Sequence, residues 1–173
     1  MLAVLQSIDD VVSPPIRSLE LGLLDYPLSV VGNTFTSAKI VVPLFIVVAW
    51  LLGNNPCFFV CCILFSHGMC YALKTTFKRQ RPPVNFGVQR LVNVRQHITG
   101  GKSERESFPS GDSSASGCFF MALALATNTP ALTVFAFPVM FARVYFFCHW
   151  VMDTVGGVLV GSSGPYILEK VFG

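Results

Sequence analysis

Apolar residues run along this chain in long blocks that are separated by short polar stretches rich in Gly, Pro and Asn. A helix needs about 20 mostly apolar residues to cross the hydrocarbon core of a bilayer. Five blocks approach that length, at about residues 36–52, 57–77, 110–126, 131–147 and 150–171. The pattern therefore predicts an all-α fold, an integral membrane bundle of about five transmembrane helices that makes one domain of residues 1–173.

The first 33 residues follow a different pattern, because charged residues recur among the apolar ones and Pro14-Pro15 and Pro27 interrupt them. Apolar positions gather near one helical face and polar positions lie off it: Leu2, Leu5, Ile8 and Val12 against Gln6, Asp9 and Asp10. Amphipathic helices of this kind lie in the membrane interface. We expect one or two short interfacial helices in residues 1–33, ahead of a transmembrane core of residues 36–171. A cleaved leader is the alternative.

The composition is that of a membrane protein. Apolar residues make up 53% of the chain and charged residues 12%, with a mean hydropathy of +0.62, whereas a soluble domain has about 25% charged residues. The cysteines all fall in apolar segments, without the paired spacing to His that a zinc site needs: Cys57, Cys61, Cys62, Cys70, Cys118 and Cys148. We interpret them as small hydrophobic side chains and expect no metal and no cofactor.

Positive charge is concentrated in one part of the chain. Between Lys74 and Arg105 lie eight Lys and Arg residues and one acid, Glu104. Such a patch suits nucleic acid or anionic lipid, but no nucleic-acid-binding motif accompanies it, so we expect membrane lipids as partners and no nucleic acid. We assign six of these side chains to lipid headgroups: Lys78, Arg79, Arg90, Arg95, Lys102 and Arg105. His97 in the same loop is expected to be solvated or to face the headgroups. The positive-inside bias would place this face in the cytoplasm, unless the cations serve catalysis.

Three polar clusters interrupt the apolar pattern, at residues 74–82, 109–112 and 143–153. If the second spanning helix ends at one membrane face, the third begins there, the fourth returns to it and the fifth starts from it. The three clusters then meet at that face. Cations among apolar helices are unfavourable unless an anion uses them, so the topology predicts an anion-binding site.

The first cluster presents two cations. Lys74 and Arg81 are seven residues apart, so a continuing helix would place them nearly on one face, and Pro82 would end that helix. An ammonium and a guanidinium together suit the oxygens of a phosphate group. The alternative is a basic patch next to the membrane that meets anionic headgroups.

The second cluster, Pro109-Ser110-Gly111, opens the third spanning segment. A helix N-terminus offers free N–H groups and a positive dipole end to an anion, and Gly111 lets the anion approach the backbone. The Ser110 hydroxyl can donate as well. The alternative is an ordinary serine cap on a helix.

The third cluster holds a candidate nucleophile. Arg143 and His149 are six residues apart and cannot share one face of a continuous helix, so we expect a break between the fourth and fifth segments. His149 and Asp153 are four residues apart, which places them on one face if both are helical. Asp153 would then hold the Nδ1 proton and leave Nε2 free to attack phosphorus. The alternative is a buried pair that serves packing.

The pattern Lys-x6-Arg-Pro, Pro-Ser-Gly-x and Arg-x5-His-x3-Asp, from Lys74 to Asp153, resembles the type 2 phosphatidic acid phosphatase (PAP2) superfamily. That superfamily includes lipid phosphate phosphatases, polyisoprenyl diphosphatases and vanadium haloperoxidases. The resemblance implies a metal-independent phosphatase in which His149 forms a phosphohistidine and Asp153 orients it. It also implies a set of residues that bind the phosphoryl oxygens: Lys74, Arg81, Ser110, Gly111 and Arg143.

One position departs from the family pattern. Where the family usually has a His that acts as general acid for the leaving group, this chain has Asp112. Loss of a general acid slows a reaction by roughly 10²–10⁴-fold when the leaving group is poor. Three interpretations stay open: Asp112 is protonated and acts as the acid, the leaving group needs little help, or the site binds lipid phosphate without turning it over.

We therefore expect a multi-pass membrane lipid phosphatase of the endoplasmic reticulum or plasma membrane. Its substrate would be a lipid diphosphate or monophosphate, such as polyisoprenyl diphosphate, diacylglycerol pyrophosphate or phosphatidic acid. The alternative is a catalytically weak protein that binds or transports lipid phosphate. A channel is disfavoured because the charges gather at one face, and a haloperoxidase because those relatives are soluble.

Overall fold

The computed structural model of the chain describes residues 2–36, 38–83, 90–92, 94 and 103–172. The regular elements in these ranges are all helical, which confirms the predicted all-α bundle. The headgroup contacts expected for Arg95, His97 and Lys102 lie outside the described residues.

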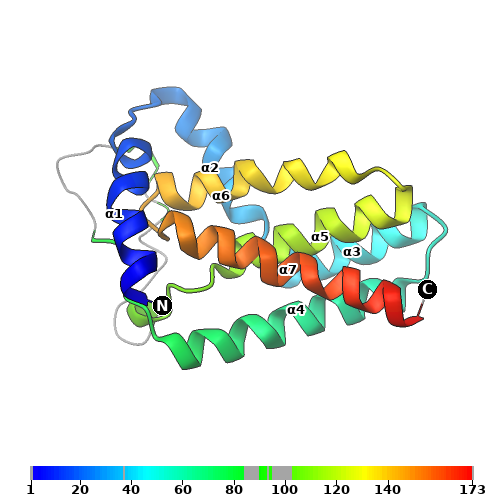
Figure 1. Cartoon of the computed structure of the whole chain (residues 1–173). Coiled ribbons are helices and arrows are strands. Elements are labelled where there is room, and N and C mark those ends of the chain that lie inside the picture. The colour runs from blue at the N-terminus through cyan, green and yellow to red at the C-terminus, as the bar shows by residue number, and fades with distance from the viewer. Residues whose placement is uncertain (1, 37, 84–89, 93, 95–102, 173) are drawn as a thin grey trace.

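Most of the helices lie side by side in the bundle, and one helix crosses its end (Figure 1). The α-helices are α1 (Leu2–Ser18), α2 (Asp25–Thr34), α3 (Ala38–Leu51), α4 (Pro56–Phe77), α5 (Gly111–Thr127), α6 (Ala136–Tyr145) and α7 (Val151–Phe172). Shorter 3₁₀ turns are η1 (Gly22–Leu24), η3 (Ser103–Arg105) and η4 (Pro130–Phe135). The five predicted segments correspond to α3, α4, α5, η4 with α6, and α7, with ends that differ by a few residues.

Local sequence signals explain where these helices begin and end. Asn55 caps α4 by accepting a hydrogen bond from the amide of Cys57 at 2.9 Å, and Pro56 occupies the first helical position. Lys78 adopts a left-handed conformation (φ 46°) that ends α4. Asn128 does the same at the end of α5 (φ 52°), as its place in the predicted turn indicates.

The bundle packs around aromatic side chains. Phe45, Phe59 and Phe119 are buried at its centre, and Phe45 and Phe119 have ring centroids 4.9 Å apart. By length and composition alone, α4 is the described helix that could cross a bilayer, while α3 and η4–α6 are apolar but shorter. The number of helices that span the membrane therefore stays a prediction.

Small residues let α7 approach α5 closely. A Cβ at Gly157 would lie 2.5 Å from the carbonyl oxygen of Ser110, and a Cβ at Gly161 would collide with that of Ser114. Glycine permits such backbone contact between helices. The first turns of α7 are thereby pressed against the N-terminus of α5, where two of the predicted clusters lie.

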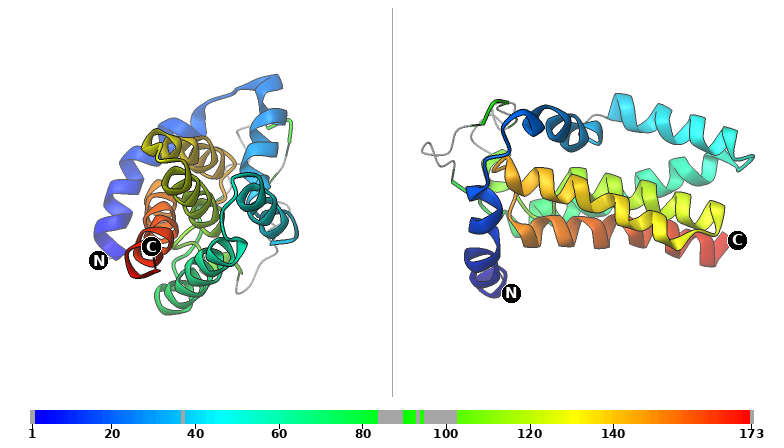
Figure 2. Two further views of the ribbon diagram at one scale, coloured as in Figure 1. Left: turned by 90° about the vertical axis from the view of Figure 1, so that its right-hand side faces the viewer. Right: turned by 90° about the horizontal axis from the view of Figure 1, so that it is seen from above.

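Helix α1 runs across one end of the bundle, nearly perpendicular to α7 (Figure 2). Its polar face, rather than its apolar face, contacts the bundle: Asp9 and Ser13 are fully buried, whereas Val4 and Val11 are 62% and 73% exposed. The amides of Met152 and Val151 donate to Asp9 Oδ1 (2.9 Å) and Ser13 Oγ (3.3 Å). Asp9 and Ser13 therefore bind free N–H groups at the start of α7.

Candidate active site

The three predicted clusters lie at the same end of the bundle, where α4 ends, α5 begins and the chain turns from α6 into α7 (Figure 1). Helix α1 crosses this end as well (Figure 2). Arg79 and Asp153, 74 residues apart, are in direct contact, so the first and third clusters meet as the topology argument predicted. Helix α1, which that argument did not include, joins them through Asp9.

The helical conformation is interrupted between α6 and α7, as expected. Helix α6 ends at Tyr145, and Phe147 takes a left-handed conformation (φ 57°). The amides of Cys148 and His149 both donate to the carbonyl oxygen of Arg143, at 3.0 and 3.1 Å. His149 is buried in this tight turn, with only 2% of its surface exposed.

Both nitrogens of the His149 ring have partners. Nδ1 lies 2.8 Å from the carbonyl oxygen of Ser107, and Nε2 lies 3.0 Å from Nη1 of Arg81. A carbonyl oxygen only accepts and a guanidinium only donates. The proton therefore sits on Nδ1, and the lone pair of Nε2 faces the cation. This is the tautomer that a nucleophilic Nε2 requires.

Asp153 does not take the place predicted for it. Its carboxylate is 3.8 Å from Nδ1 of His149, beyond hydrogen-bonding distance. It accepts instead from the Ser107 hydroxyl and from the amide of Trp150 (3.0 Å). The spacing argument was wrong because His149 precedes α7, whose first residue is Val151. Asp153 therefore binds Ser107, and the carbonyl oxygen of Ser107 in turn binds the His149 ring.

Lys74 and Arg81 lie close to this loop. Lys74 Nζ donates to the carbonyl oxygen of Glu106 at 2.8 Å, and Arg81 Nη1 donates to that of Cys148 at 2.6 Å. The helix predicted to carry both cations ends at Phe77, so Arg81 reaches the site from the following segment. The two cations converge, but not through a shared helical face.

Ser110 and Gly111 form the start of α5. The Ser110 hydroxyl caps the helix by accepting from the amide of Ser113 at 3.3 Å, and its own amide donates to the carbonyl oxygen of Asp153 at 2.8 Å. A Cβ at Gly111 would lie 3.9 Å from Cε of Lys74. The first turn of α5 and the Lys74 side chain therefore adjoin.

Arg143 and Asp112 form a buried ion pair. Nε of Arg143 lies 2.9 Å from Oδ2 of Asp112, in contact but without the angle of a hydrogen bond. Nη1 of Arg143 donates to Oδ1 of Asn33 at 3.2 Å, so α2 also supports this side chain. Asp112, which the resemblance placed at the position of a general acid, is thus held against a guanidinium.

The electrostatics of the site favour an anion. Lys74, Arg81 and Arg143 carry three positive charges against the two carboxylates of Asp112 and Asp153. Burial, and then the nearby cations, lower the pKa of His149 well below its usual 6.5. The imidazole is therefore neutral at neutral pH, as a nucleophile must be.

Residues 55–168, more than half of the chain, match the sequence model of the PAP2 superfamily. The chain belongs to the PAP2 superfamily. A search of curated protein sequences finds no match.

Two solved structures share the fold of this PAP2 chain. The transmembrane PAP2-type phosphatidylglycerolphosphate phosphatase from Bacillus subtilis superposes with a TM-score of 0.76 at 18% identity, over 99% of this chain and 87% of its own. LpxE from Aquifex aeolicus superposes with a TM-score of 0.68 at 22% identity, over 91% and 92%. The Bacillus subtilis superposition covers 99% of this chain, so it includes the N-terminal helices as well as the matched residues.

Sequence reasoning missed two contributors to this PAP2 site. Arg79, assigned to headgroups, is 5% exposed and pairs with Asp9 (2.8 Å) and Asp153 (2.6 Å). Ser107 supplies the acceptor for His149. The headgroup assignment of Arg79 was wrong because α4 ends before it. Asp9 and Asp10 in an apolar helix were the one available signal of a buried partner.

Arg90 was assigned to headgroups as well, and it also contacts protein. It donates to the carbonyl oxygens of Leu19 (2.5 Å) and Arg17 (2.6 Å), and its guanidinium lies 3.8 Å from the centroid of the Tyr145 ring. These contacts tie the segment after Arg81 to the end of α1.

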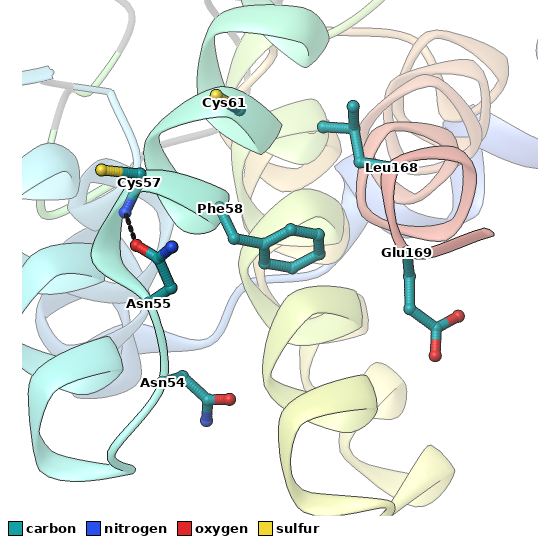
Figure 3. A pocket seen from close by; sticks show the side chains of 7 residues that line it. All are labelled: Asn54, Asn55, Cys57, Phe58, Cys61, Leu168 and Glu169. Carbon is teal, nitrogen blue, oxygen red and sulfur yellow. Dashed lines mark hydrogen bonds between the residues drawn. The ribbon is translucent and has the colours of Figure 1, made fainter. Parts of the chain in front are cut away.

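A pocket of about 450 Å³ lies at the opposite end of the bundle, between the start of α4 and the end of α7 (Figure 3). It is lined by Asn54, Asn55, Cys57, Phe58, Cys61, Leu168 and Glu169. None of the predicted site residues lines it, so this pocket is separate from the cations and from His149. Among the described residues, no three His, Cys, Asp or Glu side chains are grouped to hold a metal ion.

Proposed function

We propose that this PAP2 protein is a multi-pass membrane lipid phosphatase that forms a phosphohistidine on His149. One observation carries the proposal: Nε2 of His149 has its lone pair directed at Arg81, while Nδ1 keeps its proton on Ser107. A phosphoryl group bound between these two side chains would present its phosphorus to the Nε2 lone pair and its oxygens to the guanidinium of Arg81.

In the first step, phosphoryl oxygens bind Lys74, Arg81 and the amides that begin α5. The Nε2 lone pair attacks phosphorus, an N–P bond forms, and the bond to the leaving oxygen breaks with its electron pair. The ring becomes cationic, because Nδ1 retains its proton. The Ser107 carbonyl and the carboxylate of Asp153, 3.8 Å away, stabilise that charge.

In the second step, water attacks the phosphohistidine. The N–P bond breaks, its electron pair returns to Nε2, and phosphate leaves with the protons of the water. His149 is then neutral, ready for the next substrate. The cations that held the substrate also stabilise the phosphoryl oxygens in this step.

The ion pair at Asp112 favours a lipid diphosphate as substrate. The Asp112 carboxylate is held against the Arg143 guanidinium in a buried ion pair, so it is engaged with a cation rather than with a leaving group. A phosphate leaving from a diphosphate needs little protonation, since its second pKa is about 6. An alkoxide leaving from phosphatidic acid needs much more. Polyisoprenyl diphosphate and diacylglycerol pyrophosphate are therefore expected to react faster than phosphatidic acid.

The location of the site agrees with a lipid substrate. The cations lie at the end of an apolar bundle that α1 crosses with its apolar side chains facing outward, where a headgroup would reside while its chains remain in the bilayer. We expect about five spanning helices and residence in the endoplasmic reticulum or plasma membrane.

The test is a phosphate-release assay on the purified full-length protein in detergent with EDTA. The substrates are phosphatidic acid, lysophosphatidic acid, sphingosine phosphate and isoprenyl diphosphates. Wild type should release phosphate, and His149→Ala should not. Activity lost in EDTA and regained with a divalent metal would contradict the metal-free mechanism.

A second candidate function is a lipid-phosphate-binding or lipid-transporting protein without turnover. The observation that favours it is Asp112, which occupies the place of the family's general acid. In that case wild type and His149→Ala would bind the same lipids in a vesicle co-sedimentation assay, and neither would release phosphate.

A further inference from the structure

A chain of buried charges leads from α1 into the candidate active site. Nη2 of Arg79 lies 2.8 Å from Oδ2 of Asp9, and Nη1 lies 2.6 Å from Oδ1 of Asp153. Asp9 and Asp153 are fully buried and Arg79 is 5% exposed. Gln6 accepts a further hydrogen bond from Nη2 at 3.0 Å. One guanidinium therefore connects two carboxylates that lie near opposite ends of the sequence.

Arg79 also holds Ser107 through the backbone. The amide of Ser107 donates to the carbonyl oxygen of Arg79 at 2.9 Å, and its hydroxyl donates to Asp153. The carbonyl of the same serine receives the Nδ1 proton of His149. Arg79 therefore positions Ser107, the hydrogen-bond acceptor for His149, in two ways. Its carbonyl oxygen binds the Ser107 amide, and its guanidinium binds Asp153, which accepts from the Ser107 hydroxyl.

Asp9 uses both of its oxygens in this arrangement. Oδ2 pairs with Arg79, and Oδ1 accepts from the amide of Met152 at the start of α7. The carboxylate therefore connects the residue that holds Ser107 to the helix that carries Asp153. A helix that only rested on the membrane would leave its acids in water, because burying a charge is strongly unfavourable unless a partner compensates it.

We propose that Asp9 and Arg79 are positioning residues for His149, so that α1 is an integral part of the active site and not only a membrane-surface helix. The inference rests on the phosphohistidine function proposed above. It assigns Asp9, which lies outside all three sequence clusters, and Arg79 a role in aligning the nucleophile.

Charge balance gives the proposal a specific consequence. The charged groups facing His149 are Lys74 from α4, Arg81 after it, Asp112 from α5, Arg143 from α6 and Asp153 from α7. Asp9 shares the charge of Arg79. Without Asp9 the full charge of Arg79 falls on Asp153, and that carboxylate stabilises an imidazolium less. The cationic form of the ring that develops during attack is then harder to reach.

The proposal therefore separates catalysis from binding. The side-chain contacts described for Asp9 and Arg79 lead to Gln6, Ser13, Trp150, Asp153 and the start of α7, and not to the phosphate-binding cations. Asp9→Asn should lower kcat by about 10- to 100-fold, the size of effect that slight misplacement of a reacting group produces. KM and the inhibition constant of inorganic phosphate should stay within about twofold, and the acidic limb of the kcat/KM profile should move to lower pH.

The experiment compares Asp9→Asn with Asp10→Asn in the full-length protein in detergent. Asp10 is the exposed neighbour on the same helix and contacts Gln6 (2.7 Å), so it controls for loss of an acid from α1. Asp10→Asn should behave as wild type, and Asp9→Glu should recover part of the lost kcat. Arg79→Lys, which keeps the charge but not the forked geometry, should show the same loss of kcat.

Wild-type kcat in Asp9→Asn would overturn the proposal. A second result would also overturn it: a lower kcat together with weaker phosphate binding and a lower Tm, while the pH profile of kcat/KM stays unchanged. That is the pattern of a helix with a merely structural role. If Asp9→Asn fails to fold, Arg79→Lys is judged by the same criteria. A wild-type protein that releases no phosphate from any lipid contradicts the proposed function instead, which keeps the two failures distinct.

Discussion

Replacing Asp112 with histidine tests the predicted departure of this chain from the family pattern. The substitution provides an acid at the position where the family usually has one, on the first turn of α5. General acid catalysis is worth about 10²–10⁴-fold for a poor leaving group, which corresponds to roughly 3–5 kcal/mol in the activation barrier. The gain should appear for an alkoxide leaving group and be nearly absent for a phosphate leaving group.

The same substitution has a structural consequence. It removes the carboxylate 2.9 Å from Nε of Arg143, whose other described partners are Oδ1 of Asn33 at 3.2 Å and the carbonyl oxygen of Gly32 at 3.5 Å. Removing one partner of a buried ion pair destabilises a protein by about 3–5 kcal/mol. The ligand-free Tm should fall, and inorganic phosphate should raise the Tm of Asp112→His more than that of wild type, because it supplies the missing negative charge.

The assay is kcat/KM for phosphatidic acid and for an isoprenyl diphosphate, with Asp112→Asn as the matched control. Asp112→Asn also removes the negative charge, but the asparagine side chain has no acidic proton to give to a leaving group. We expect Asp112→His to raise the phosphatidic acid rate by about 10²-fold or more and the diphosphate rate by less than about tenfold. Equal changes on both substrates, or an equal gain in Asp112→Asn, would refute the reasoning.

Three further predictions concern other parts of the structure. Asp153→Asn should lower kcat by about 10²-fold with a smaller change in KM, because a misplaced Ser107 misaligns the nucleophile; steady-state kinetics test this. The lowered pKa of His149 predicts that kcat/KM stays constant as pH falls to 6.5 and declines only well below it; the unfolded chain takes up that proton near pH 6.5, so the Tm should also fall below this pH. Gly161→Ala should destabilise by about 1–3 kcal/mol through collision with Ser114, whereas Gly68→Ala, which meets open space, should not reduce the Tm.

The sequence predicted the elements of the bundle well because their signals are local. Long apolar blocks and the Asn and Pro residues between them each act within a few residues of the backbone that they shape. The break between α6 and α7 followed from the incompatible spacing of Arg143 and His149. Convergence of the clusters needed only the rule that consecutive spanning helices alternate in direction.

The details of the site were not predictable in the same way. Helical spacing suggested a direct bond from His149 to Asp153 and a shared face for Lys74 and Arg81, but both pairs extend beyond the helix ends. The acceptor for His149 is a backbone carbonyl, which has no sequence signature. Arg79 finds its partner on α1, and such a long-range pairing becomes visible only once the chain is folded.

The most direct test of the account is identification of the covalent intermediate. The protein is mixed with a lipid diphosphate that carries ³²P in its terminal phosphoryl group, quenched in base within milliseconds, and mapped by proteolysis. We predict a label that is stable in base, labile in acid and located on His149, and that is absent from His149→Ala. Turnover without any labelled peptide, or a label on a residue other than His149, would contradict the central claim.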